Sequence, residues 1–113
     1  MANILENLNE RQLQAVTAPE KSVLILAGAG SGKTRVLTTR IAWLLEKGAC
    51  RTSEILAVTF TNKASREMLS RIESVLKVNT RGMWVGTFHG LCNRMLRVHA
   101  ADAGLPSGFQ IID

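Results

Sequence analysis

The sequence predicts an α/β fold with a parallel sheet and flanking helices. Short apolar runs rich in β-forming residues alternate with helical segments of roughly 10 to 16 residues, and strands joined through helices pair in parallel. The runs at residues 23–26 and 55–58 are continuously apolar, as in strands that are covered on both faces. Hydrophobic residues make up 46% and charged residues 20% of the 113 residues, which excludes a disordered tail, a collagen-like repeat and a coiled coil.

The first half of the chain predicts a helix, a strand and a second helix. Residues 9–16 form the first helix, in which Asn9 caps the N-terminus and Gln12 completes a capping-box pair. Residues 22–26 form a strand that enters a glycine-rich turn. Gly48 ends the next helix, whose apolar residues share one face: Leu37, Ile41, Leu44 and Leu45.

The second half repeats this alternation. Its strands are expected at residues 55–60, 83–86 and 109–112. Helices at residues 62–77 and 88–103 separate them, and Gly104 and Pro106 stop the second of these helices. Ligands of such sheets bind beyond the carboxyl ends of the strands, where each motif described below is found.

Charge and sorting signals narrow the function classes. The formal charge is +5, and the excess of basic residues lies after residue 29, which favours a polyanionic partner although many basic proteins bind no nucleic acid. The longest nearly apolar stretch, residues 23–30, is far shorter than the roughly 20 residues that cross a bilayer. Glu6 and Glu10 argue against a secretory signal, and the two distant cysteines, Cys50 and Cys92, favour reduced thiols in the cytoplasm.

The strongest motif is a phosphate-binding loop between the first strand and the second helix. It consists of small residues followed by Lys33 and Thr34: Ala27, Gly28, Ala29, Gly30, Ser31 and Gly32. Small residues let successive backbone N–H groups converge on phosphate oxygens, at the positive end of a helix. Lys33 is expected to reach the β- and γ-phosphates, and the Thr34 hydroxyl to ligate Mg²⁺. A purely structural turn does not explain the Lys-Thr pair, so we predict nucleoside triphosphate binding, with Ala27 replacing the usual first glycine.

Two motifs accompany the phosphate-binding loop in other proteins: the guanine-reading motif is missing here, and the acid that supports Mg²⁺ has one candidate. Asn62-Lys63 is followed by Ala64-Ser65, so the sequence lacks the Asn-Lys-x-Asp pattern that reads guanine. Asp113 ends an apolar run and could be the acid that supports Mg²⁺, or it could simply end a strand.

Four segments together resemble the UvrD/PcrA/Rep group of superfamily 1 DNA helicases. They are residues 8–12 (LNERQ), 27–35 (AGAGSGKTR), 59–64 (TFTNKA) and 86–90 (GTFHG). The resemblance implies a RecA-like P-loop NTPase fold, with residues 1–113 as the N-terminal part of the first motor domain. From about residue 89 the chain is expected to lead into an inserted helical subdomain.

The resemblance also assigns roles to nucleotide-binding residues. Gln12 would hydrogen-bond adenine, a role compatible with capping its helix. Lys33 and Thr34 would be the catalytic lysine and the magnesium ligand, and Arg35 would lie near the nucleotide. Arg40, further along the helix, is expected to be a surface or packing residue.

The remaining two motifs match the family's contacts with single-stranded DNA. Phe60 would lie against a base, while Thr61, Asn62 and Lys63 would hold the sugar–phosphate backbone; a second patch would comprise Thr87, Phe88 and His89. Aromatic stacking and basic or hydroxyl groups suit this task on chemical grounds. The alternatives are core packing for Phe60 and an ordinary helix N-terminal position for His89.

The implied function is that of an ATP-dependent 3′-to-5′ DNA helicase using ATP and Mg²⁺. Its expected partners are single-stranded DNA, 3′-tailed duplex DNA, and mismatch- and excision-repair proteins, in the cytoplasm of a bacterium and near its nucleoid. Because the acidic motif and the second motor domain are missing from these 113 residues, we expect the chain alone to hydrolyse ATP negligibly. The alternative is a nucleotide- or DNA-binding module without motor activity.

Overall fold

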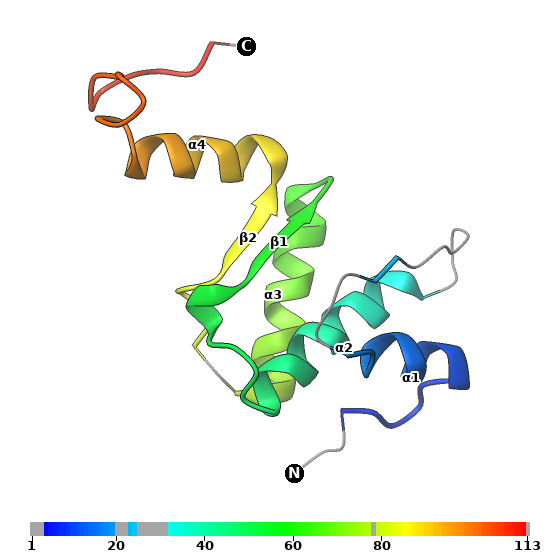
Figure 1. Cartoon of the computed structure of the whole chain (residues 1–113). Helices are drawn as coiled ribbons and strands as arrows, with labels where there is room; N and C mark the ends of the chain where they lie inside the picture. Colours follow the sequence, from blue (N-terminus) through cyan, green and yellow to red (C-terminus); the bar gives the residue numbers. More distant parts are fainter. Residues whose placement is uncertain (1–3, 20–22, 25–31, 78, 113) are drawn as a thin grey trace.

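The computed structural model describes residues 4–19, 23–24, 32–77 and 79–112. Its elements follow one another as α1 (Glu10–Val16), α2 (Lys33–Glu46), the short 3₁₀ helix η1 (Thr52–Glu54), β1 (Leu56–Thr59), α3 (Asn62–Leu76), β2 (Trp84–Thr87) and α4 (Phe88–Val98). Figure 1 shows α1 and α2 at one end of the molecule, α4 at the other, and the strands with α3 between them.

The two strands pair in parallel through the connection formed by α3. Leu56 is opposite Trp84, and Thr59 at the end of β1 is opposite Thr87 at the end of β2. This βαβ unit confirms the predicted α/β class and parallel pairing, and among the described residues the sheet has two strands. Its consequence for function is that the carboxyl ends of β1 and β2 lie side by side.

The core lies where α2 and α3 pack on the sheet. Met68 and Ile72 of α3 are almost completely buried and contact Ile41 of α2, Ala57 of β1 and Met83 just before β2. Burying such side chains is worth about 1.5–3 kcal/mol each, so this cluster fixes α2 against the strands. The start of α2 and the end of β1 are thereby held on the same side of the molecule.

The predicted capping box of α1 and the predicted glycine after α2 are confirmed. The Asn9 side chain accepts a hydrogen bond from the Gln12 backbone N–H at 2.8 Å, and the Gln12 side chain accepts one from the Asn9 N–H at 3.0 Å. Gly48 follows α2 and has a φ of +75°, a backbone conformation that is strained for residues with a side chain. After this glycine the Ala49 N–H donates back to the Leu44 carbonyl in the last turn of the helix.

Two sequence predictions are wrong. Residues 109–112 form no strand: the Phe109 N–H donates to the Pro106 carbonyl in a turn, while its own carbonyl accepts from Arg97 of α4. An apolar run becomes a strand only beside another strand whose backbone accepts and donates its hydrogen bonds. Here the Phe109 carbonyl is bonded to the Arg97 side chain instead. The last helix ends at Val98, not at residue 103, because the chain turns away at His99; Gly104, with a φ of +72°, closes a separate turn.

The predicted first strand, at residues 22–26, lies mostly outside the described residues. Val23 and Leu24, which are described, are not in a strand. The other two strands begin and end within one residue of their predicted bounds. No helix in the described part of the chain combines the length and the apolar character needed to cross a membrane.

Candidate nucleotide and nucleic-acid site

The first turn of α2 presents Lys33 and Thr34 to solvent. Gly32 precedes them as the N-cap, with a φ of +80° that favours glycine, and no side chain among the described residues caps this helix. The N–H groups of the first turn therefore remain available to an anion, at the positive end of a 14-residue helix. The remaining predicted loop residues lie outside the described residues: Ala27, Gly28, Ala29, Gly30 and Ser31.

Gln12 lies beside the last residue of this loop. Its side-chain nitrogen, Nε2, is 3.1 Å from the position that a Cβ atom at Gly32 would occupy. The side-chain oxygen of Gln12 is already engaged in the capping box of α1. Capping thus holds the amide in a defined orientation with its nitrogen toward Gly32, so the capping and ligand-binding roles are compatible.

Two arginines of α2 contact the chain that precedes the loop. Arg35 Nη2 donates to the Glu6 carbonyl at 3.4 Å. Arg40, expected to be a surface or packing residue, is half-buried and donates to four backbone carbonyls at the end of α1 and just after it. Arg40 is therefore a packing residue, and Arg35 joins the first turn of α2 to the N-terminal segment.

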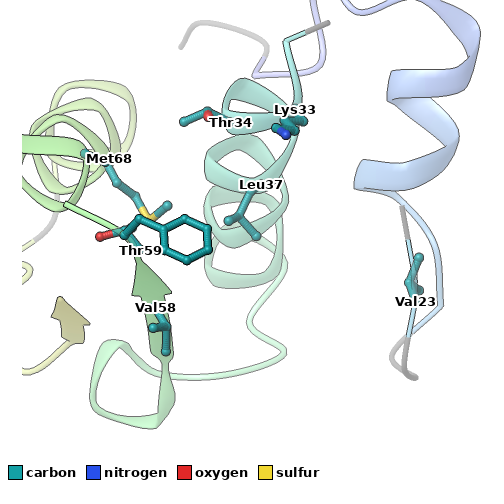
Figure 2. Close-up of a pocket in the computed structure, with 9 residues that line it drawn as sticks. Val23, Lys33, Thr34, Leu37, Val58, Thr59 and Met68 are labelled. Carbon is teal, nitrogen blue, oxygen red and sulfur yellow. The ribbon is translucent and has the colours of Figure 1, made fainter. Parts of the chain in front are cut away.

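A cavity of about 430 Å³ joins the first turn of α2 to the end of β1. Lys33, Thr34 and Leu37 line it from α2, and Figure 2 shows Leu37 pointing toward Thr59 and Met68, which line it from the other side. Its other lining residues are Val23, Val58, Phe60 and Ala64. Two proposed nucleotide-binding residues, Lys33 and Thr34, and one proposed DNA-binding residue, Phe60, thus line the same cavity.

Hydroxyl groups shape the turn that exposes Phe60. Thr59 Oγ1 donates to the Thr61 carbonyl at 2.9 Å and is 2.5 Å from Ser65 Oγ, so Ser65 supplies the proton to that contact. The chain reverses direction around Phe60, whose side chain is 94% exposed. This exposure excludes the core-packing alternative for Phe60 within this chain.

The other predicted DNA-binding residues lie at two neighbouring helix N-termini. Thr61 caps α3 by accepting from the Ala64 N–H at 3.0 Å, and Thr87 caps α4 by accepting from the Gly90 N–H at 3.1 Å. The first two residues of each helix are exposed: Asn62 and Lys63 on α3, and Phe88 and His89 on α4. Because Thr59 pairs with Thr87 across the sheet, the two motifs form one continuous edge.

Sequence reasoning missed Ser65 and the contacts of Arg40. A serine six residues after a threonine at a strand end gives no signal by itself, because the contact depends on α3 turning back over β1. A metal would find few ligands in the described part of the chain, which contains no group of three or more histidines, cysteines or acids. The hydroxyl of Thr34 fits Mg²⁺, an ion that keeps several waters and binds to substrate phosphates, and Asp113 lies outside the described residues.

Comparison with known proteins decides the family. Residues 8–113 match the model of the UvrD/REP helicase N-terminal domain. The chain belongs to this family. It is 56% identical over 110 residues to DNA helicase II of Escherichia coli. The matched region covers 97% of this chain and 15% of the relative.

Two further relatives give the same picture. The chain is 51% identical over 117 residues to DNA helicase II of Haemophilus influenzae and 47% identical over 113 residues to the ATP-dependent DNA helicase PcrA of Staphylococcus epidermidis. Both matches cover all of this chain and 16% of the relative. The chain therefore spans about a sixth of the length of these curated relatives.

Proposed function

We propose that this chain is the N-terminal part of an ATP-dependent DNA helicase that moves 3′ to 5′ along single-stranded DNA. Residues 1–113 would begin a RecA-like first motor domain, and from about residue 89 the chain would lead into an inserted helical subdomain. The observation that supports this proposal best is the shared cavity, which brings Lys33 and Thr34 next to the turn that exposes Phe60. The printed names of the relatives, DNA helicase II and ATP-dependent DNA helicase PcrA, point the same way.

The nucleotide half would bind ATP with Mg²⁺. The uncapped N-terminus of α2 offers backbone N–H groups to the phosphates, and Lys33 adds a mobile positive charge next to them. Thr34 would donate one ligand to Mg²⁺, which neutralises phosphate charge when it is bound. The Gln12 amide, held beside Gly32, would recognise the adenine edge by a hydrogen bond.

The DNA half would bind one strand along the carboxyl edge of β1 and β2. Phe60 would stack on a base, which tolerates any sequence, and its exposure leaves both faces of the ring accessible. The N-termini of α3 and α4 would attract backbone phosphates, together with Lys63 and with the polar groups of Asn62 and His89. Thr61 and Thr87 would act mainly through the caps that hold these turns.

The described residues offer no carboxylate cluster to complete the hydrolytic machinery. We therefore expect the 113-residue chain to bind ATP but to hydrolyse it negligibly. Turnover would require the remainder of a longer protein, whose partners we expect to include 3′-tailed duplex DNA and the proteins of mismatch and excision repair in a bacterial cytoplasm.

The experiment is strand separation by the longer protein on duplexes with a single 3′ or 5′ tail. We expect ATP-dependent unwinding of the 3′-tailed duplex and little unwinding of the 5′-tailed one. Replacing Lys33 by alanine should abolish unwinding of either duplex. ATP and DNA binding without strand separation would instead indicate a nucleotide- or DNA-binding module that lacks motor activity.

A further inference from the structure

The guanidinium of Arg40 is the most heavily engaged cationic group in the described part of the chain. Its Nη1 atom is 3.1 Å from the carbonyl oxygens of Ala15 and Val16 and 3.0 Å from that of Ala18. Its Nη2 atom is 3.2 Å from the Pro19 carbonyl. The Arg40 side chain of α2 thus forms hydrogen bonds with four backbone carbonyls, at the end of α1 and in the segment that follows it.

The sequence of α1 explains why these carbonyls need an external donor. The helix has seven residues, too few to be stable alone, and its last turn contains no basic residue. The carbonyls of a last helical turn have no partner within the helix, and they attract a cation. The Thr17 N–H and hydroxyl both donate to the Leu13 carbonyl, so Arg40 supplies the donors for the carbonyls beyond it.

Two contacts near the other end of α1 lie close to the phosphate loop. Gln12 Nε2 lies beside Gly32, and Arg35 donates to the Glu6 carbonyl just ahead of α1. At the Arg40 end of α1, Val16 is fully buried where α1 packs on α2. The position of the Gln12 amide relative to Gly32 is therefore fixed by how α1 is fastened to α2.

We propose that Arg40 is a positioning residue for base recognition in the nucleotide site. It touches no nucleotide itself; it holds α1 so that the Gln12 amide stays beside the phosphate loop and selects an adenine nucleotide. This inference rests on the proposed ATP site and adds to it the residue that sets its selectivity. The planar guanidinium has five donors in a fixed fork, which a lysine ammonium, with one nitrogen, cannot reproduce across four carbonyls.

The test compares the affinities for ATP and for inorganic tripolyphosphate, measured by calorimetry on the complete helicase that we propose contains this chain. The ratio of the two affinities isolates the contribution of the nucleoside, and it is independent of the fraction of protein that is active. We expect Arg40→Met to lower this ratio about three- to tenfold, the range of one hydrogen bond. Tripolyphosphate binding should change less than twofold, and Arg66→Met, at an exposed position on α3, should leave the ratio as it is.

A double-mutant cycle with Gln12 separates the possible failures. Gln12→Ala should lower the ratio, and adding Arg40→Met to it should lower the ratio no further, because both changes remove the same contact. If Gln12→Ala lowers the ratio while Arg40→Met leaves it unchanged, the role of Arg40 is refuted and the adenine contact stands. If Gln12→Ala has no effect, the adenine contact of the proposed function fails, and this proposal fails with it.

The conservative variant guards against a folding defect. Should Arg40→Met prevent folding, Arg40→Lys, which keeps the charge and loses the fork, replaces it in the same comparison. A lowered ratio in Arg40→Lys with native-like melting supports the positioning role, and an unchanged ratio overturns it.

Discussion

The two halves of the candidate site are held together by different kinds of hydrogen bond. In the nucleotide half, Arg35 and Arg40 reach back 20 or more residues along the chain, to Glu6 and to the end of α1. In the DNA half, the side-chain hydrogen bonds of Thr59, Thr61 and Thr87 span six residues or fewer. One half depends on how two helices pack, and the other on local turns that follow the strands.

This difference indicates how each half should respond to substitution. A local turn can fail without disturbing the nucleotide half, since no described bond of Thr61 or Thr87 reaches α1 or α2. Loss of a long-range contact should instead move a whole helix. The predictions below use this contrast, beginning with the largest expected effect.

Removing the amine of Lys33 should abolish the proposed motor activity. Lys33→Ala deletes the charge next to the uncapped N-terminus of α2, and we expect ATP hydrolysis by the longer protein to fall about 100-fold or more. Steady-state phosphate release measures this effect. Arg81→Ala, at another exposed basic residue, is the control; a Lys33 variant that retains normal turnover would place the ATP site elsewhere.

Removing the Phe60 ring should weaken DNA binding alone. Stacking on one base is worth about 1–3 kcal/mol, so Phe60→Ala should lower the affinity for single-stranded DNA by roughly 5- to 150-fold in fluorescence titrations. ATP affinity should not change. Phe109→Ala is the matched control, because it also removes a phenyl ring, but one that contacts Arg97 of α4 and lies outside the proposed DNA site. Equal effects of the two substitutions would contradict the assignment of Phe60.

The hydroxyl chain behind Phe60 should contribute both to stability and to DNA binding. Thr59→Val keeps the shape of the side chain and removes its bonds to Thr61 and Ser65, which should cost about 1–2 kcal/mol in urea unfolding. Ser65→Ala leaves the bond from Thr59 to Thr61 in place, so it should cost less. The affinity for DNA should also fall more in Thr59→Val than in Ser65→Ala. A larger loss of stability or DNA affinity in Ser65→Ala would show that the bond from Thr59 to Thr61 does not hold the turn.

Loss of the α1 cap should have the smallest effect. Asn9→Ala removes one half of the capping box, for about 1 kcal/mol of stability. The substitution removes the acceptor of the Gln12 backbone N–H but leaves the bond from the backbone N–H of residue 9 to the Gln12 side chain, so ATP affinity should drop by less than in Gln12→Ala. Asn9→Asp, which restores an acceptor, should recover most of the stability, and an effect on DNA affinity larger than on ATP affinity would contradict the assignment of α1 to the nucleotide half.

The same contrast explains how much could be predicted from the sequence. The structure confirms three local patterns: the capping box of Asn9 and Gln12, the glycine that follows α2 at position 48, and the starts of α3 and α4 after Thr61 and Thr87. The contacts of Arg40 depend on the packing of α1 against α2, which no local pattern encodes.

The strand predicted at residues 109–112 failed for a related reason. Its apolar composition is typical of a strand, but a strand also needs a neighbouring backbone, which is a property of the tertiary structure. In the described chain, Phe109 contacts Arg97 through both its ring and its carbonyl.

The most direct test of a shared nucleotide and DNA site is whether the two ligands influence each other. The affinity of the longer protein for a single-stranded oligonucleotide would be measured with and without a non-hydrolysable ATP analogue. Because Lys33, Thr34, Thr59 and Phe60 line one cavity, we expect the affinity to change about fivefold or more, and Lys33→Ala to abolish the change. Equal DNA affinities with and without the analogue, at saturating nucleotide, would contradict a site in which the two ligands share one cavity.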